Sequence, residues 1–309
     1  AQEDAQTTLY SAARTAAAPW TWERGITGNG ITVAVLEVPD DAGNSGIALN
    51  NPYVSATAHY DDNTCEGDHA TEVAGVIAST HTTDKGVAYG ATLLSANAKS
   101  GQEHHIIAAA DWAIKNGANI INGSFGVSCG DRSITSQDKY FDWVVWKERK
   151  TVVIAAGNLR SQCNTIYNVS SPGKAYNVIT VGAKDDKNTA ETETDTQDDQ
   201  FCAFSLYVDP ETTSSNRLKP EVVAVGQRIN STIPQSPWIG TEVAGTSFSA
   251  PIVAGQAALM MQRSDWLEFS PEAVKAGIMT TARWTSLKDD VDPNQQASID
   301  KMGVGAIDT

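Results

Sequence analysis

The stretch GTSFSAPIVAG, residues 245–255, decides the fold of this 309-residue chain. Its first glycine permits a tight turn, and the small residues at its end are typical of a buried helix that packs closely on all sides. Ser247 stands where that helix is expected to begin, near unsatisfied backbone N–H groups and the positive end of the helix dipole. Pro251 is expected within the first turn, where its missing N–H is tolerated. The pattern fits a serine placed beside a developing anion, and it also fits a plain helix cap.

Short apolar stretches alternate with amphipathic helical patterns along the rest of the chain. This alternation predicts an α/β fold with a mainly parallel sheet covered by helices on both faces. Neither an internal repeat nor an interdomain linker interrupts it, so we expect one domain over residues 1–309, with residues 1–19 as a surface arm. The predicted strands are 31–36, 92–96, 120–124, 151–155, 178–182 and 221–225, and the predicted helices follow Asp68 and cover 106–115, 140–148, 249–263 and 271–282.

The chain carries 37 acidic and 22 basic residues, for a formal net charge of −15. This excess argues against nucleic-acid binding, which needs basic patches. Apolar residues make up 41% of the chain, but each long apolar stretch is soon broken by a polar residue, so no membrane span is predicted. Part of the acidic excess lies in residues 191–199, which we interpret as a solvated surface loop, with a calcium-binding loop as the alternative.

Four polar residues are expected to meet at one edge of the sheet. Glu37 and Asn158 directly follow predicted strands, whereas His69 and Ser247 begin predicted helices. Sites in open parallel sheets form at the carboxyl ends of the strands. A serine hydroxyl is a weak nucleophile until a base removes its proton, and a histidine oriented by a carboxylate is such a base. The histidines without this setting are His59, His81, His104 and His105.

Four segments together resemble the subtilisin-like serine peptidases, or subtilases, in the order of that family. ITVAVLE (31–37) resembles the strand that ends in the triad acid, and DHATEVAGVIA (68–78) resembles the histidine helix. AAGN (155–158) resembles the oxyanion segment, and the stretch 245–255 resembles the nucleophile motif. The resemblance runs from about Trp20 to the end of the chain. It implies the subtilisin-like three-layer fold.

The resemblance also implies a function. Glu37, His69 and Ser247 would form the catalytic triad of a secreted serine endopeptidase, and Asn158 would donate to the oxyanion together with the N–H of Ser247. The expected partner is a protein or peptide substrate, bound by a monomer from which an N-terminal pro-region has been removed. The first four residues are acidic and do not resemble a signal peptide, so a secreted form would be a processed one. No cofactor is implied, and a structural calcium ion is left open without assigned ligands.

Peptide substrates bind subtilases as added strands, which implies further site residues. Residues 122–126 resemble the family's substrate-binding strand, and residues 99–101 lie where the opposite strand would be. The small residues before Asn158 would form one wall of the first specificity pocket and leave room for a large side chain, with Ser170 and Ser171 at its base. The expected substrate-binding residues are Ser124, Phe125, Gly126, Gly101, Ala155, Ala156 and Gly157.

The chain departs from the family pattern at the triad acid, where the family has aspartate and this chain has Glu37. Pro39 shows that the following loop is built differently, so Asp40 and Asp41 are alternative acids if that loop folds back. Two histidines that are usual in the family motifs are replaced by Glu72 and Ile252, at positions without a chemical role.

Two competing functions follow from these departures. The first is a catalytically impaired, subtilase-like binding domain that has lost activity together with its aspartate. The second is a serine-carboxyl peptidase, which would need an aspartate at the oxyanion position and acids in place of the histidine. His69 and Asn158 occupy those positions, so we set the second aside.

The four cysteines predict two disulfides in a secreted enzyme. Cys129 follows the segment that resembles the substrate strand, and Cys163 follows the one that resembles the oxyanion strand. Those strands should be neighbours, so we expect a Cys129–Cys163 bridge, with Cys65–Cys202 as the remaining pair.

Overall fold

A computed structural model describes residues 13, 16–40, 43–60, 66–126, 130–160, 167–187, 198–211, 218–283, 287–289 and 297–307. These residues form an eight-stranded sheet in the order β2-β3-β1-β4-β5-β6-β7, with β8 also paired to β6. All of its pairs are parallel except β6 with β7. A separate antiparallel hairpin pairs β9 with β10. The predicted α/β fold with a mainly parallel sheet is confirmed.

The helices and strands lie close to the predicted ranges where the apolar pattern is strong. The strands of the sheet are β1 (Thr32–Glu37), β2 (Ala56–His59), β3 (Thr92–Asn97), β4 (Ile120–Gly123), β5 (Thr151–Ala155), β6 (Ile179–Asp185), β7 (Gln200–Phe201) and β8 (Val222–Val225), and the hairpin is β9 (Ile229–Thr232) with β10 (Ile239–Val243). The helices are α2 (Ala18–Trp22), α3 (Asp68–Ala78), α4 (Glu103–Lys115), α5 (Ser136–Lys147), α6 (Thr246–Arg263), α7 (Pro271–Thr281) and α8 (Ile299–Met302), with the 3-10 helix η2 at Asp265–Phe269.

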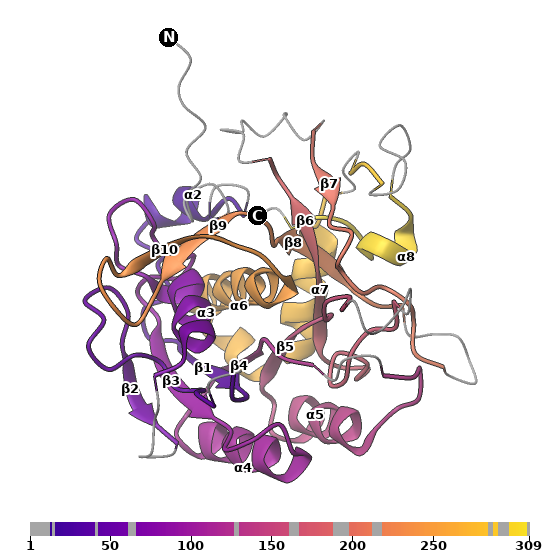
Figure 1. Ribbon diagram of the computed structural model, residues 1–309, viewed down its shortest axis with the longest axis horizontal. Coiled ribbons are helices and arrows are strands. Elements are labelled where there is room, and N and C mark those ends of the chain that lie inside the picture. Colours follow the sequence, from indigo (N-terminus) through magenta and orange to yellow (C-terminus); the bar gives the residue numbers. More distant parts are fainter. Residues whose placement is uncertain are drawn as a thin grey trace.

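The sheet has an apolar core on each face. Successive side chains of a strand point to opposite faces, so Val33 and Val35 of β1 join one core while Ala34 and Leu36 join the other. The first core includes apolar residues of α3, α6 and α7, and the second includes those of α4 and α5. Figure 1 shows the resulting layers, with α4 and α5 beside each other at the lower edge of the view. Burial on both faces explains why the central strands are apolar throughout.

The long helix α6 begins at Thr246, so Pro251 lies in its interior and the first-turn prediction is wrong. A proline inside a helix cannot donate to the carbonyl four residues earlier, which here belongs to Ser247. The hydroxyl of Ser124 donates to that carbonyl instead, at 2.8 Å. The carbonyl that Pro251 leaves without a helical donor therefore joins the start of α6 to the segment that follows β4.

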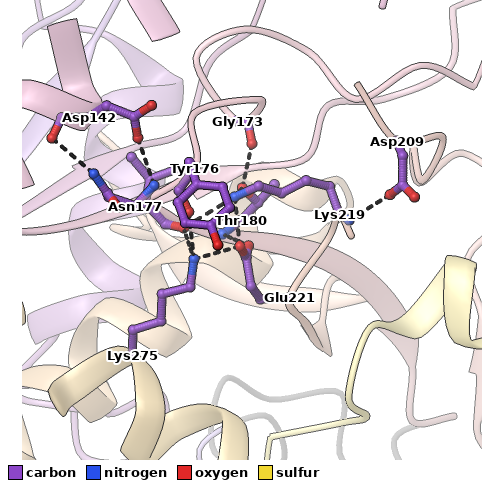
Figure 2. A network of polar contacts seen from close by, with 10 residues as sticks. Asp142, Gly173, Tyr176, Asn177, Thr180, Asp209, Lys219, Glu221 and Lys275 are labelled. Atoms are coloured by element: carbon purple, nitrogen blue, oxygen red, sulfur yellow. Dashed lines mark hydrogen bonds and ion pairs between the residues drawn. The ribbon is translucent and has the colours of Figure 1, made fainter. Parts of the chain in front are cut away.

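A cluster of buried charges holds the chain before β6 (Figure 2). The carboxylate of Glu221 accepts from the ammonium groups of Lys219 and Lys275 at 2.7 and 2.6 Å, and from the backbone N–H of Thr180 at 2.8 Å. Burial lowers the pKa of Lys219 to about 8, although Glu221 acts in the opposite direction. The hydroxyl of Thr180 donates to the carbonyl of Gly173 at 2.6 Å. The cluster thus fixes the segment that follows Ser170.

Three expectations about the surface and the cysteines need correction. Ala13, Ala16 and Ala18 are buried in the core, so the described part of the N-terminal arm does not lie on the surface. Asp199, expected in a solvated loop, is buried and pairs with Lys184 of β6. Cys202 is a free, buried thiol, so the Cys65–Cys202 pairing is wrong. Its burial raises the pKa of the thiol.

The other cysteines, which include the expected Cys129–Cys163 pair, lie outside the described residues, as does most of the acidic stretch 191–199. Among the helices that the structure describes, none is both long and apolar enough to cross a membrane.

Candidate active site

A cavity of about 380 Å³ opens at the carboxyl ends of β1, β4 and β5, beside the start of α6. It brings together the four residues that the sequence predicted at one sheet edge, Glu37, His69, Asn158 and Ser247. The other lining residues are Val38, Pro39, Asp40, Ser124, Phe125, Gly126, Ala155, Gly157, Arg160, Ser170, Ala244, Thr246 and Phe248.

The carboxylate at the end of β1 contacts the histidine of α3. Oε2 of Glu37 lies 3.1 Å from Nδ1 of His69, and the glutamate is only 1% exposed. Burial by itself lowers the pKa of His69, but the charge and hydrogen bond of Glu37, together with the charges of Glu72 and Asp40, outweigh it, so this pKa lies above its ordinary value. Glu37 therefore favours the proton on Nδ1 and leaves Nε2 as the nitrogen that can accept one.

The second acid of this loop has a different role. Asp40 lines the cavity and contributes to the raised pKa of His69. Its Oδ1 accepts the backbone N–H of Asn44 at 2.9 Å, which closes its own loop. The direct hydrogen bond to His69 comes from Glu37.

The serine lies in the first turn of α6, where backbone N–H groups lack intrahelical partners. Its hydroxyl donates to the backbone carbonyl of Ser124 at 3.0 Å, while its own carbonyl accepts from the Ser124 hydroxyl. The ring of Phe248, the next residue, contacts that of His69 with centroids 5.7 Å apart. In this structure the Ser247 hydroxyl is thus bonded to the segment after β4.

Asn158 is held by the same helix start. Its Oδ1 accepts from the backbone N–H and the hydroxyl of Thr246, at 2.9 and 3.0 Å. Since the carbonyl oxygen is used in this way, the amide NH₂ is left for the cavity. Gly245 has φ +149°, and a Cβ there would lie 3.1 Å from Nδ2 of Asn158. Only glycine combines that backbone conformation with room for the amide.

The expected substrate-binding residues divide into two groups. Ser124, Phe125, Gly126, Ala155 and Gly157 line the cavity. Ala156 is fully buried, and Gly101 lies in an exposed turn before α4; neither is among the lining residues.

The side chain of Ser170 lies between the two walls of this part of the cavity. A Cβ added at Gly126 would come within 2.5 Å of its Cβ, and one added at Gly157 would come within 2.3 Å of its Oγ. Ser170 therefore contacts both walls, in agreement with its expected place at the base of the pocket. Ser171 does not line the cavity, and its hydroxyl donates to buried Asp138 at 2.8 Å.

Sequence reasoning did not single out Arg160 or Phe248, which also line the cavity, and it gave Glu72 no role. Glu72 lies one turn after His69 on α3, and burial raises its pKa to about 7 against the opposing charge of His69. The position of Arg160, two residues after Asn158, was the only signal available for it in the sequence.

Within the described residues, no three histidine, cysteine, aspartate or glutamate side chains are grouped to hold a metal ion. The arrangement in the cavity is instead that of an acid, a base, a hydroxyl and an amide donor, which is the set that acyl transfer requires.

Residues 28–305 match the profile of the subtilase family. Serine protease AprX of Bacillus subtilis (strain 168) is 30% identical over 304 residues, covering 87% of this chain and 64% of that protein. Subtilisin E of the same strain is 31% identical over 273 residues, covering 85% and 63%. Subtilisin DY of Bacillus licheniformis is 29% identical over 277 residues, covering 86% and 88%.

A solved structure, that of the prenylagaramide maturation protease PagA, aligns with a TM-score of 0.71 at 22% identity and covers 94% of both chains, which shows a shared fold. This chain belongs to the subtilase family, as its motifs predicted. It spans less than two thirds of the length of AprX and of subtilisin E.

Proposed function

We propose that the chain is a secreted serine endopeptidase that cleaves peptide bonds through an acyl-enzyme on Ser247. Glu37 orients His69, His69 is the general base and acid, and Asn158 is an oxyanion donor. The observation that carries the proposal is the contact between Glu37 and His69 inside the cavity that also holds Ser247 and Asn158. Family membership supports the reaction class. The secreted location rests on what the resemblance to subtilases implies.

The reaction begins when Nε2 of His69 takes the proton of Ser247 as Oγ attacks the carbonyl carbon of the substrate. The carbonyl oxygen becomes an oxyanion and accepts from Nδ2 of Asn158 and the N–H of Ser247. When the intermediate collapses, the C–N bond breaks and His69 gives its proton to the departing amine. Water then attacks the acyl group by the same proton route, and releases the acid product and free Ser247.

Glu37 contributes in two ways. As an acceptor on Nδ1 it holds the tautomer whose Nε2 is free, and as a charge it stabilises the imidazolium that forms in each step. It is hidden from solvent, so its charge is poorly screened and acts mainly on His69.

The test is digestion of an unbiased peptide library by the purified protein and by Ser247→Ala. We expect internal cleavage by the wild type only. Equal cleavage by both proteins would refute the mechanism, and binding of peptides without cleavage by either would instead favour the catalytically impaired domain.

A further inference from the structure

The residues that line the cavity include a cation, Arg160, that the proposed mechanism does not use. Arg160 is the one lysine or arginine among the lining residues, in a chain whose net charge is −15. Its side chain is exposed, and among the described residues it forms no ion pair or hydrogen bond. An arginine in this state has all of its donors available to a ligand.

The backbone that carries this arginine is fixed. Asn158 forms a β-bridge with Ser205, and the N–H of Leu159 donates to the carbonyl of Phe204 at 2.6 Å. The amide of Asn158 is itself held by Thr246. The arginine therefore follows Asn158 by two residues on a backbone that is fixed up to Leu159, and it lines the same cavity.

The acidic groups of the cavity lie toward the histidine. Glu37 contacts His69, and Asp40 raises the pKa of the same imidazole. The negative and positive groups are thus associated with different catalytic residues, His69 and Asn158. Both acids therefore act on His69, whereas Arg160 follows Asn158 by two residues in the chain.

We propose that Arg160 is a specificity-determining residue, which selects peptide substrates with an aspartate or glutamate close to the cleaved bond, on the side bound beside Asn158. This inference rests on the proposed peptidase function and names its substrate class. The carboxylate pairs with the guanidinium, whose planar fork matches carboxylate geometry. Because the arginine is exposed, the preference for the acid over its amide should be modest, about 1.5- to 5-fold in kcat/KM.

The experiment measures kcat/KM for pairs of peptides that differ only by glutamate or glutamine, at each position flanking the cut. We expect the wild type to favour the acid at one position and Arg160→Gln to bring that ratio close to one. Arg160→Lys should keep part of the preference, and Arg160→Glu should favour lysine over glutamine at the same position. The ratio is taken within one variant, so differences in the fraction of active protein cancel.

Two controls test whether the ratio of kcat/KM for glutamate over glutamine peptides depends on the charge of Arg160. Arg24→Gln removes an exposed arginine that bonds the carbonyl of Trp20, outside the cavity, and should leave the preference unchanged. Raising NaCl from about 0.1 to 1 M shortens the screening length from about 10 to 3 Å, so it should shrink the wild-type ratio.

The outcomes separate the two proposals. If no peptide is cleaved in a Ser247-dependent manner, the peptidase proposal fails and the inference fails with it. If peptides are cleaved but the acid-to-amide ratio is one at every position, or persists in Arg160→Gln, the inference alone is overturned.

Discussion

Replacement of Glu37 by glutamine should remove most of the activity while leaving the fold intact. The amide fills the same space at the end of β1 but carries no charge, and it can present NH₂ to Nδ1 of His69, 3.1 Å from the present carboxylate oxygen. Either effect disfavours the tautomer that accepts the serine proton. Replacement of the triad aspartate by asparagine, the corresponding acid-to-amide change in a related triad, lowers kcat by about 10⁴, which corresponds to about 5 kcal/mol in the activation free energy.

The same variant should also change the pH dependence in a defined direction. In the wild type, burial lowers the pKa of His69, but Glu37 and the smaller contributions of Glu72 and Asp40 together raise it above 6.5, so kcat/KM should rise with pH through a value above 6.5 as the imidazole becomes neutral. In Glu37→Gln, burial remains while the main raising group is gone, so the pKa of His69 should fall. An NMR titration of the His69 ring in both proteins measures this shift independently of activity.

Two further variants test which acid is used. Aspartate at position 37 is shorter by one methylene, about 1.5 Å, so an acceptor now 3.1 Å from Nδ1 leaves hydrogen-bonding range and activity should drop. Asp40→Asn should keep most of the activity, because that side chain bonds its own loop. The assignment of Glu37 as the acid would be refuted by the opposite result. In that case Asp40→Asn would be inactive, while Glu37→Gln would keep normal activity and an unchanged pKa of His69.

Two other predictions concern the base of the pocket and the buried charges. Ser170→Gly should raise the ratio of kcat/KM for phenylalanine over alanine before the cut by about tenfold, because it removes the side chain that contacts both walls; an unchanged ratio in paired peptide assays would show that Ser170 does not limit the pocket. Glu221→Gln should lower the free energy of unfolding, measured in denaturant titrations, by about 3–5 kcal/mol, because it leaves two ammonium groups without their counter-charge. The control Glu272→Gln breaks an exposed pair with Arg149 and should lower it by less than about 1 kcal/mol. Equal losses in these two variants would argue against a buried charge cluster.

Strong apolar patterns made most of the sheet predictable. The strand at 151–155 was predicted with its observed bounds, and the neighbouring central strands to within a residue or a few, because burial on both faces requires continuous apolar runs. β6 extends to Asp185, beyond the predicted end at residue 182, because Lys184 is buried against Asp199, a pairing that local sequence does not reveal. β2 is short and rich in alanine, and the β9–β10 hairpin surrounds two prolines, so neither carried a strong strand signal.

The site was predictable to the extent that topology places it. Residues that end parallel strands or begin the following helices converge at one edge, which is why Glu37, His69, Asn158 and Ser247 line one cavity. Side-chain packing across distant segments was not predictable: Ser170 contacts Gly126 and Gly157 only because the tertiary fold joins their loops.

The most direct measurement of the central claim is covalent labelling by a fluorophosphonate, with the modified residue located by mass spectrometry. The account predicts one adduct, on Ser247, which forms on the folded wild type, forms more slowly on Glu37→Gln, and is absent from Ser247→Ala. An adduct on another residue, or a folded wild type that takes no label while cleaving peptides, would contradict the assignment of Ser247 as the nucleophile.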